Sequence, residues 1–146
     1  MAHHLRDEIE IETVLVVDDD EFIREMEVRI LNQLGYNVLQ AEDPAQAMRL
    51  AAATPNIHLL LTDFLMPGAD GLQLAAQFRT VHPHTPVLMV SGSLPLINAR
   101  ADHPDHFALL AKPFTRDELT QKVRASLNAH SPPCSRFTKL VGNAPL

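Results

Sequence analysis

Five short runs of apolar residues recur along the chain, and each has the length of a β-strand. They cover residues 14–17, 36–41, 57–62, 87–90 and 107–111. Four of these runs are almost continuously apolar, which is typical of strands in a parallel sheet that helices cover on both faces. The run at 36–41 alternates more between apolar and polar residues, so we expect it to lie nearer an edge of the sheet.

The segments between these runs have the spacing of amphipathic helices. In the first segment, the apolar stripe is formed by Phe22, Ile23, Met26, Ile30, Leu31 and Leu34. This helix stops at Gly35, a residue suited to a left-handed helix cap. A second helix is expected to start at the Asp43–Pro44 pair and a third to span residues 71–82. The last helix is expected to begin at the capping box of residues 115–118.

Strands that alternate with helices predict an α/β fold, a doubly wound five-stranded parallel sheet with right-handed connections. The segment 92–106, "GSLPLINARADHPDH", contains a glycine and two prolines. It therefore predicts a short or irregular fourth helix. We expect an N-terminal extension over residues 1–12, one folded domain over 13–129 and a C-terminal tail over 130–146.

Composition and charge restrict the classes of function. The 146 residues, 46% of them apolar and 21% charged, suffice for one ordinary core and not for two domains. Lys and Arg number 12 against 18 Asp and Glu, without a basic cluster, so we expect no direct binding of nucleic acid. The single cysteine, Cys134, excludes an intramolecular disulfide. No apolar run approaches the roughly 18 to 20 residues that cross a bilayer, so we expect a cytoplasmic protein without a membrane partner.

The chain contains eight histidines, and none of them stands in a pattern that indicates a metal site. Two pairs surround prolines, at residues 82–84 and 103–106, and we expect these histidines to be solvated turn residues. His58 stands at the beginning of a predicted strand. We expect it to be a structural residue whose ring nitrogens have hydrogen-bond partners.

Polar side chains gather at the carboxyl ends of four predicted strands, where open parallel sheets bind their ligands. They are Asp18, Asp19, Asp63, Ser91 and Lys112. Carboxylates that lie together repel, since two unit charges about 4 Å apart cost about 4 kcal/mol at an effective dielectric constant near 20. A hard divalent cation suits such oxygen ligands, and Mg²⁺ suits a small open cluster. Asp20 stands directly before a helix, and we interpret it as a helix cap.

In this combination and order, the motifs resemble the response-regulator receiver domain of two-component signalling. They are "VLVVDDDE" (14–21), "LLLTDFLMPGADG" (59–71), "PVLMVSGS" (86–93) and "AKPF" (111–114), and the resemblance covers about residues 13–129. It implies a flavodoxin-like (βα)5 fold, Mg²⁺ as the cofactor and a sensor histidine kinase or a histidine-phosphotransfer protein as the partner. Such a domain is not a conventional enzyme, because it catalyses only its own phosphorylation and dephosphorylation.

The resemblance also implies a role for each acidic position. Asp63 corresponds to the phosphoryl acceptor, and its carboxylate also ligates the metal. Asp19 corresponds to the residue that ligates Mg²⁺ directly, and Asp18 supports it, often through water. The backbone carbonyl of Leu65 completes the protein ligands.

The remaining positions concern the bound phosphoryl group and the switch. Ser91 corresponds to the hydroxyl that hydrogen-bonds the phosphoryl group, and Lys112 to the ammonium that pairs with it. The Lys112–Pro113 bond is cis in such proteins. Leu109 departs from the family, because receivers usually carry Tyr or Phe three residues before the lysine, so the resemblance does not extend to the usual aromatic switch. Phe107 lies on the same side of the strand, about 6.6 Å further along, and we expect it to be a core residue.

Two alternatives compete with this interpretation. A phosphatase similar to the haloacid dehalogenases would use Asp18 and Asp20, but it would leave Asp63 without a role. A binding module could keep the receiver fold without being phosphorylated. Because no segment after Leu127 is long enough for an output module, we expect a stand-alone receiver, acting by docking or onward phosphotransfer, or the receiver of a hybrid histidine kinase.

Overall fold

The computed structural model describes residues 11–92 and 107–129, in which five parallel strands form one sheet. The strands are β1 (Thr13–Val17), β2 (Asn37–Ala41), β3 (Leu59–Asp63), β6 (Val87–Ser91) and β7 (Ala108–Ala111). Their order across the sheet is β2-β1-β3-β6-β7. The predicted sheet is confirmed, with β2 at an edge. The predictions for the fourth helix and the tail lie outside the described residues.

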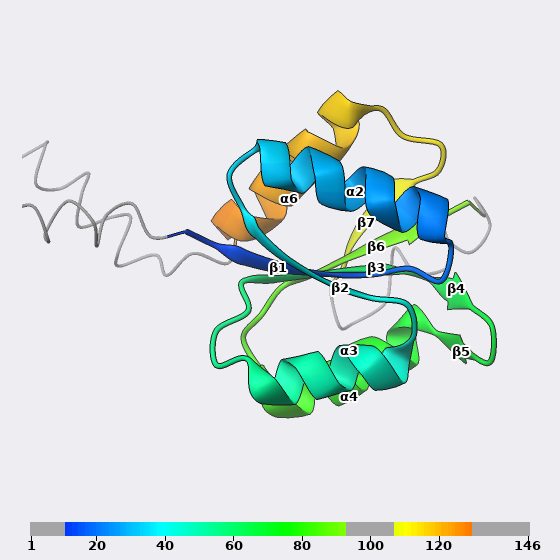
Figure 1. Ribbon diagram of the computed structural model, residues 1–146, viewed down its shortest axis with the longest axis vertical. Coiled ribbons are helices and arrows are strands. Elements are labelled where there is room, and N and C mark those ends of the chain that lie inside the picture. Colours follow the sequence, from blue (N-terminus) through cyan, green and yellow to red (C-terminus); the bar gives the residue numbers. More distant parts are fainter. Residues whose placement is uncertain (1–10, 93–106, 130–146) are drawn as a thin grey trace, which may run out of the picture.

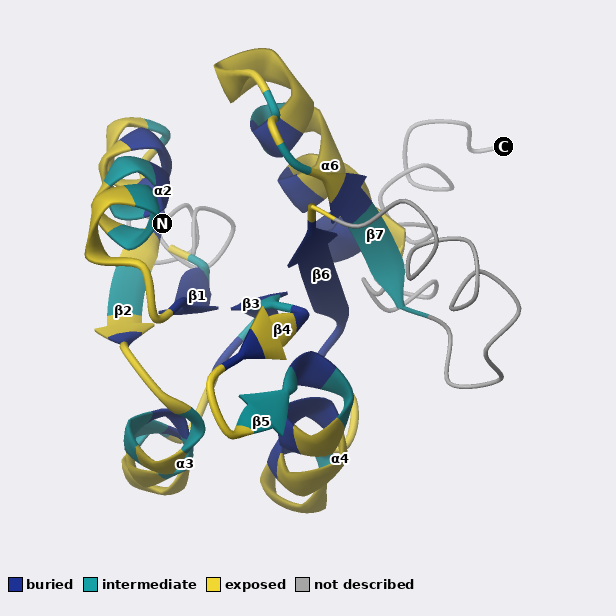
Figure 2. Ribbon diagram, turned by 90° about the vertical axis from the view of Figure 1, so that its right-hand side faces the viewer, coloured by how far each residue is buried: buried dark blue, intermediate teal, exposed yellow. Residues whose placement is uncertain are grey.

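Four described helices cover both faces of this sheet. In Figure 1, α2 (Glu21–Gln33) and α6 (Arg116–Ala129) lie on one face, and α3 (Pro44–Ala53) and α4 (Gly71–Val81) on the other. A separate apolar core fills each interface, and Figure 2 shows the buried residues gathered between the helices and the sheet. None of the described helices combines the length and apolar character needed to cross a bilayer.

Side chains close the helix ends where the sequence predicts caps. The carboxylates of Asp20 and Asp43 accept hydrogen bonds from backbone N–H groups at the starts of α2 and α3. In the capping box before α6, the backbone N–H of Glu118 donates to the hydroxyl of Thr115, and the backbone N–H of Thr115 donates to the carboxylate of Glu118. Gly35 has a φ of 95°, the left-handed conformation expected after a helix.

The buried face of α2 differs from the predicted stripe at two positions. Phe22 is 79% exposed, whereas Glu27 is only 1% exposed. At 3.6 residues per turn, position 27 follows Ile23 by four residues and precedes Leu31 by four, so it faces the core. Phe22 lies beside this stripe, and its assignment to the buried face was wrong.

His82 is buried, which corrects the expectation that it would be a solvated turn residue. It follows α4, and its Nε2 donates a hydrogen bond to the carbonyl oxygen of Ala51 at 2.9 Å. Its ring stacks on Phe78, with 5.1 Å between the ring centroids. The exposed His84 agrees with the prediction. So does His58, whose Nδ1 accepts a hydrogen bond from the backbone N–H of Thr13.

We expect His82→Ala to destabilise the domain by about 1–3 kcal/mol, because the change removes a ring contact and leaves a buried carbonyl unpaired. Urea unfolding followed by circular dichroism would measure this loss. His84→Ala is the matched control, since it removes an exposed histidine from the same turn and is expected to change stability little. Equal effects of the two substitutions would contradict this account.

A small antiparallel hairpin follows β3, and the sequence did not predict it. It pairs β4 (Leu65–Met66) with β5 (Ala69–Asp70), and Gly68 in its turn has a φ of 76°. At Gly71, which begins α4, an added Cβ would lie 2.8 Å from the carbonyl oxygen of Asp63. Only glycine therefore allows α4 to start this close to the end of β3.

Candidate functional site

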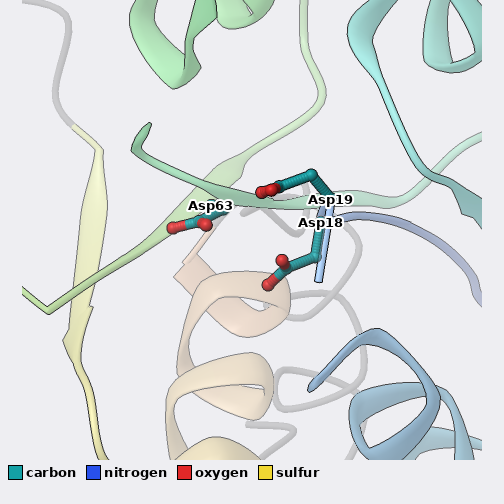
Figure 3. Close-up of side chains that lie close together, drawn as sticks. All are labelled: Asp18, Asp19 and Asp63. Atoms are coloured by element: carbon teal, nitrogen blue, oxygen red, sulfur yellow. The ribbon is translucent and has the colours of Figure 1, made fainter. Parts of the chain in front are cut away.

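Three carboxylates converge at the carboxyl edge of the sheet. Asp18 and Asp19 directly follow β1, and Asp63 is the last residue of β3, the strand that pairs with β1. One oxygen from each carboxylate lies within 4.8 Å of the other two. Figure 3 shows the three side chains extending into the same space. The parallel pairing brings together acids that are more than forty residues apart in the sequence.

Lys112 and Ser91 lie at the same edge. Lys112 follows β7, and its Nζ is 3.3 Å from Oδ2 of Asp63 and 3.7 Å from Oδ2 of Asp18. Ser91 is the buried last residue of β6, and its carbonyl oxygen accepts a 2.8 Å hydrogen bond from the backbone N–H of Lys112. The Lys112–Pro113 bond is cis. In the register between β3 and β6, Asp63 pairs with Val90, the residue directly before Ser91.

The electrostatics of the site favour an additional cation. Asp18 is 1% exposed; its Oδ1 accepts the backbone N–H of Asp20, whereas its buried Oδ2 has no hydrogen-bond partner. Burial raises the pKa of Asp18, and repulsion by Asp63 adds to this effect. Burial likewise raises the pKa of Asp63. An oxygen-rich cluster with one buried carboxylate oxygen that lacks a hydrogen-bond partner fits a hard divalent cation such as Mg²⁺.

Lys112 supplies the positive charge that the chain itself contributes. Burial alone would lower its pKa, but the negative charges of Asp18 and Asp63 outweigh that effect and raise it. The side chain is therefore an ammonium at neutral pH. Leu65, whose carbonyl the sequence predicts as a metal ligand, lies in β4, two residues after Asp63, and is 55% exposed. Its role as a ligand stays a prediction.

Glu27 is the acidic residue beside the site that sequence reasoning missed. It is buried in α2, close enough for its ionisation to be affected by Asp18, Lys112 and Asp63. Burial, followed by repulsion from Asp18, raises the pKa of Glu27 to about 8. Its position within the apolar stripe of the helix is the signal that could have identified it.

Leu109 in β7 and Phe107 directly before β7 bear on the aromatic switch that is usual in the family. Leu109 is half-buried and packs against the core under α3 and α4. Phe107 packs against the same core, and the guanidinium carbon of Arg79 lies 5.3 Å from the centroid of its ring. Phe107 is thus a packing residue, as predicted, and Leu109 offers neither a ring nor a hydroxyl at the usual switch position.

Together, the strand order and the position of the site define a class of protein. Numbered along the chain, the five strands of the sheet have the order 2-1-3-4-5, and the acidic site lies outside their carboxyl ends, as in flavodoxin-like folds. Residues 14–124 match the profile of the response regulator receiver domain. The chain therefore belongs to the response-regulator receiver family of two-component systems.

Individual relatives agree with this assignment but differ in length. The chain is 30% identical over 117 residues to the response regulator receiver protein CpdR of Brucella abortus, covering 80% of this chain and 97% of CpdR. It is 32% identical over 124 residues, 84% of its own length, to the DNA-binding transcriptional regulator NtrC of Azospirillum brasilense, of which it spans only 26%. The crystal structure of the receiver domain from the hybrid histidine kinase CckA is similar, with a TM-score of 0.67 and 30% identity, over 79% of this chain and 98% of that domain.

The local geometry favours a capping role for Asp20 over the phosphatase alternative. It requires the carboxyl group of Asp20 as a general acid, but that group accepts hydrogen bonds from the backbone N–H groups of Phe22 and Ile23 at the start of α2. This is the cap that the sequence predicted. The alternative also leaves Asp63 without a role, although Asp63 contacts Lys112.

Proposed function

We propose that this domain accepts a phosphoryl group on Asp63 within a two-component phosphorelay. Asp18, Asp19, Asp63 and the backbone carbonyl of Leu65 would hold Mg²⁺. The observation that carries the proposal is the convergence at one edge of the sheet of Asp63, two further carboxylates and the ammonium of Lys112. Carboxylates and an ammonium in this arrangement suit the positioning and charge neutralisation that phosphoryl transfer requires.

Asp63 would act as the nucleophile. One of its carboxylate oxygens attacks the phosphorus of a phosphohistidine, the P–N bond breaks, and its electron pair leaves with the imidazole, which takes up a proton. Bound Mg²⁺ would offset the charge of the carboxylates and of the phosphoryl oxygens. Lys112, held 3.3 Å from Asp63, can pair with the new acyl phosphate, which brings about −1.5 to −2 of charge.

Ser91 would transmit the change to the surface. Its hydroxyl hydrogen-bonds the phosphoryl group, and its carbonyl is already bonded to the backbone of Lys112 at the end of β7. A shift of Ser91 therefore biases the adjoining face of β7 and α6. We propose that the altered face signals by docking on a partner, or that the phosphoryl group passes onward. The domain would catalyse only its own phosphorylation and dephosphorylation.

We place the domain in the cytoplasm, and a sensor histidine kinase, a histidine-phosphotransfer protein, or both would be its partners. The similarity to a receiver of a hybrid histidine kinase supports this choice. The excess of acidic over basic residues supports a receiver that does not itself contact nucleic acid. NtrC is named as a DNA-binding regulator, but this chain spans only 26% of it.

Intact-mass measurement with peptide mapping tests the proposal. We expect acetyl phosphate to add one phosphoryl group to the protein, on Asp63, only when Mg²⁺ is present. The physical reason is that the metal and Lys112 must offset the charge that gathers around the nucleophile. Phosphate on Asp18 would instead indicate the phosphatase mechanism. Absence of uptake from acetyl phosphate, phosphoramidate and a phosphorylated histidine-phosphotransfer protein would favour a binding module that is not phosphorylated.

A further inference from the structure

We infer that Arg24 is a positioning residue for the acidic site, acting through the backbone of Asp18 rather than through its own charge. The inference rests on the proposed function, because it concerns the same Mg²⁺ site. Arg24 lies near the start of α2, and its guanidinium bridges the residue that follows β1 and a side chain of β2. Nη1 donates a 2.8 Å hydrogen bond to the carbonyl oxygen of Asp18, and Nε donates a 3.0 Å hydrogen bond to Oε1 of Gln40 in β2.

The contact with Asp18 lies at the point where the chain leaves β1 for the site. The backbone N–H of Asp18 donates to the carbonyl oxygen of Ala41 at 3.2 Å, which ties one end of this residue to β2. Arg24 holds the other end, the carbonyl that belongs to the Asp18–Asp19 peptide group. Because a peptide group is planar, fixing this carbonyl also fixes the direction in which the chain enters Asp19.

Asp19 depends on this constraint more than its neighbours do. It is exposed, so core packing does not set its orientation, whereas Asp18 is buried and bonded through Oδ1 to the backbone N–H of Asp20. Gln40 extends the constraint into the sheet, since it pairs with Val16 in the register between β1 and β2. Arg24 thus connects α2, the end of β1 and β2 at the residue that precedes Asp19, whose carboxylate is proposed to ligate Mg²⁺.

The two possible roles of Arg24, positive charge and positioning contact, predict opposite changes in Mg²⁺ affinity when the side chain is removed. If Arg24 acted mainly as a positive charge near the metal, its removal would tighten Mg²⁺ binding by reducing repulsion. If it acts by holding the peptide group, its removal leaves the carbonyl of Asp18 without this partner, and Asp19 is less often in the binding orientation. Positioning therefore predicts weaker binding in spite of the lost positive charge.

Calorimetric titration of the full chain with Mg²⁺, without any phosphodonor, distinguishes these mechanisms. We expect Arg24→Ala to weaken Mg²⁺ binding about tenfold, the lower end of the effect of losing a group that orients a metal ligand. Gln40→Ala should weaken it less, since Arg24 keeps its bond to Asp18. Arg24→Lys keeps the positive charge but does not keep both hydrogen bonds, to the carbonyl of Asp18 and to Gln40. It is therefore also expected to weaken Mg²⁺ binding.

Arg29→Ala is the matched control, because it removes an exposed arginine from the same helix and is expected to leave Mg²⁺ affinity nearly unchanged. Phosphorylation of Arg24→Ala by acetyl phosphate should approach the wild-type rate at saturating Mg²⁺, so the defect lies in metal affinity and not in the nucleophile. Thermal melts establish that each variant is folded. If Arg24→Ala does not fold, the Mg²⁺ affinities of Arg24→Lys and Gln40→Ala still test whether Arg24 is a positioning residue.

Unchanged or tighter Mg²⁺ binding by the Arg24 variants would overturn the inference. Weakening of the same size in Arg29→Ala would do so as well. The proposed function fails separately: a wild-type protein that neither binds Mg²⁺ nor takes phosphate onto Asp63 contradicts that function, whereas normal wild-type behaviour with unaffected variants contradicts only the role of Arg24.

Discussion

Asp63→Asn is expected to abolish phosphoryl uptake while making the metal-free domain more stable. The uptake is lost because an amide oxygen cannot replace the carboxylate nucleophile. The gain in stability follows from the raised pKa of Asp63, which burial causes. A carboxyl group with a raised pKa contributes stability below its unfolded pKa and loses it as the pH rises through the folded pKa. Above the folded pKa the ionised side chain therefore opposes folding, and the uncharged asparagine does not have this unfavourable effect.

Mass spectrometry after incubation with acetyl phosphate and Mg²⁺ measures the first effect, and thermal unfolding in a chelator measures the second. Mg²⁺ should also stabilise the wild-type protein more than the variant, because a ligand stabilises the state that binds it. Asp117→Asn serves as the control, since Asp117 is an exposed acid in the first turn of α6. Phosphate uptake by Asp63→Asn would show that another residue is the acceptor.

Glu27→Leu is expected to stabilise the domain strongly in mildly alkaline solution. Burial, with repulsion from Asp18, raises the pKa of Glu27 from 4.5 to about 8. The protonated side chain contributes its full stability to the fold below pH 4.5, and this contribution is lost as the pH rises through about 8. At about 1.4 kcal/mol per pKa unit the loss is of the order of 5 kcal/mol, a large share of the roughly 5–15 kcal/mol that stabilises a domain. Leucine fills a similar volume without a charge.

Urea unfolding at a series of pH values between 5 and about 9 tests this expectation through the difference between variant and wild type. The difference should grow with pH. Glu27→Gln should remove the same pH dependence but be less stable than Glu27→Leu, because an amide remains buried. Glu25→Gln, an exposed change in the same helix, should leave the pH dependence as it is. Parallel curves for wild type and Glu27→Leu would mean that Glu27 is not a buried acid with a raised pKa.

Sequence pattern sufficed for most of the fold because central strands and helix caps depend on local composition. β1, β3 and β6 are buried along almost their whole length, which is why their sequences are continuous apolar runs. The caps at Asp20 and Asp43 depend only on side chains that reach the adjacent helix turn. The hairpin of β4 and β5 escaped prediction because two-residue strands leave no periodicity to detect.

Errors arose where a residue's environment is set by elements distant in sequence. His82 stands in a proline-containing turn, yet Ala51 of α3 supplies its hydrogen-bond partner. Glu27 lies in line with the apolar stripe of α2, but a charged residue at such a position is normally exposed, and only the packing of α2 against the sheet buries it. Phe22 is the converse case, an apolar residue beside the stripe that the sheet does not cover.

By itself, the sequence determined the five strands of the parallel sheet, the four described helices and the residues that gather at the carboxyl edge of the sheet. These follow from apolar periodicity and from the position of polar residues at strand ends, which are local properties. Only the tertiary structure decided the distances from Lys112 to Asp63 and Asp18, the burial of Glu27 and the contact between Arg24 and Asp18. Distances and burial arise from the packing of separate elements, and pKa values depend on both, so no local pattern specifies them.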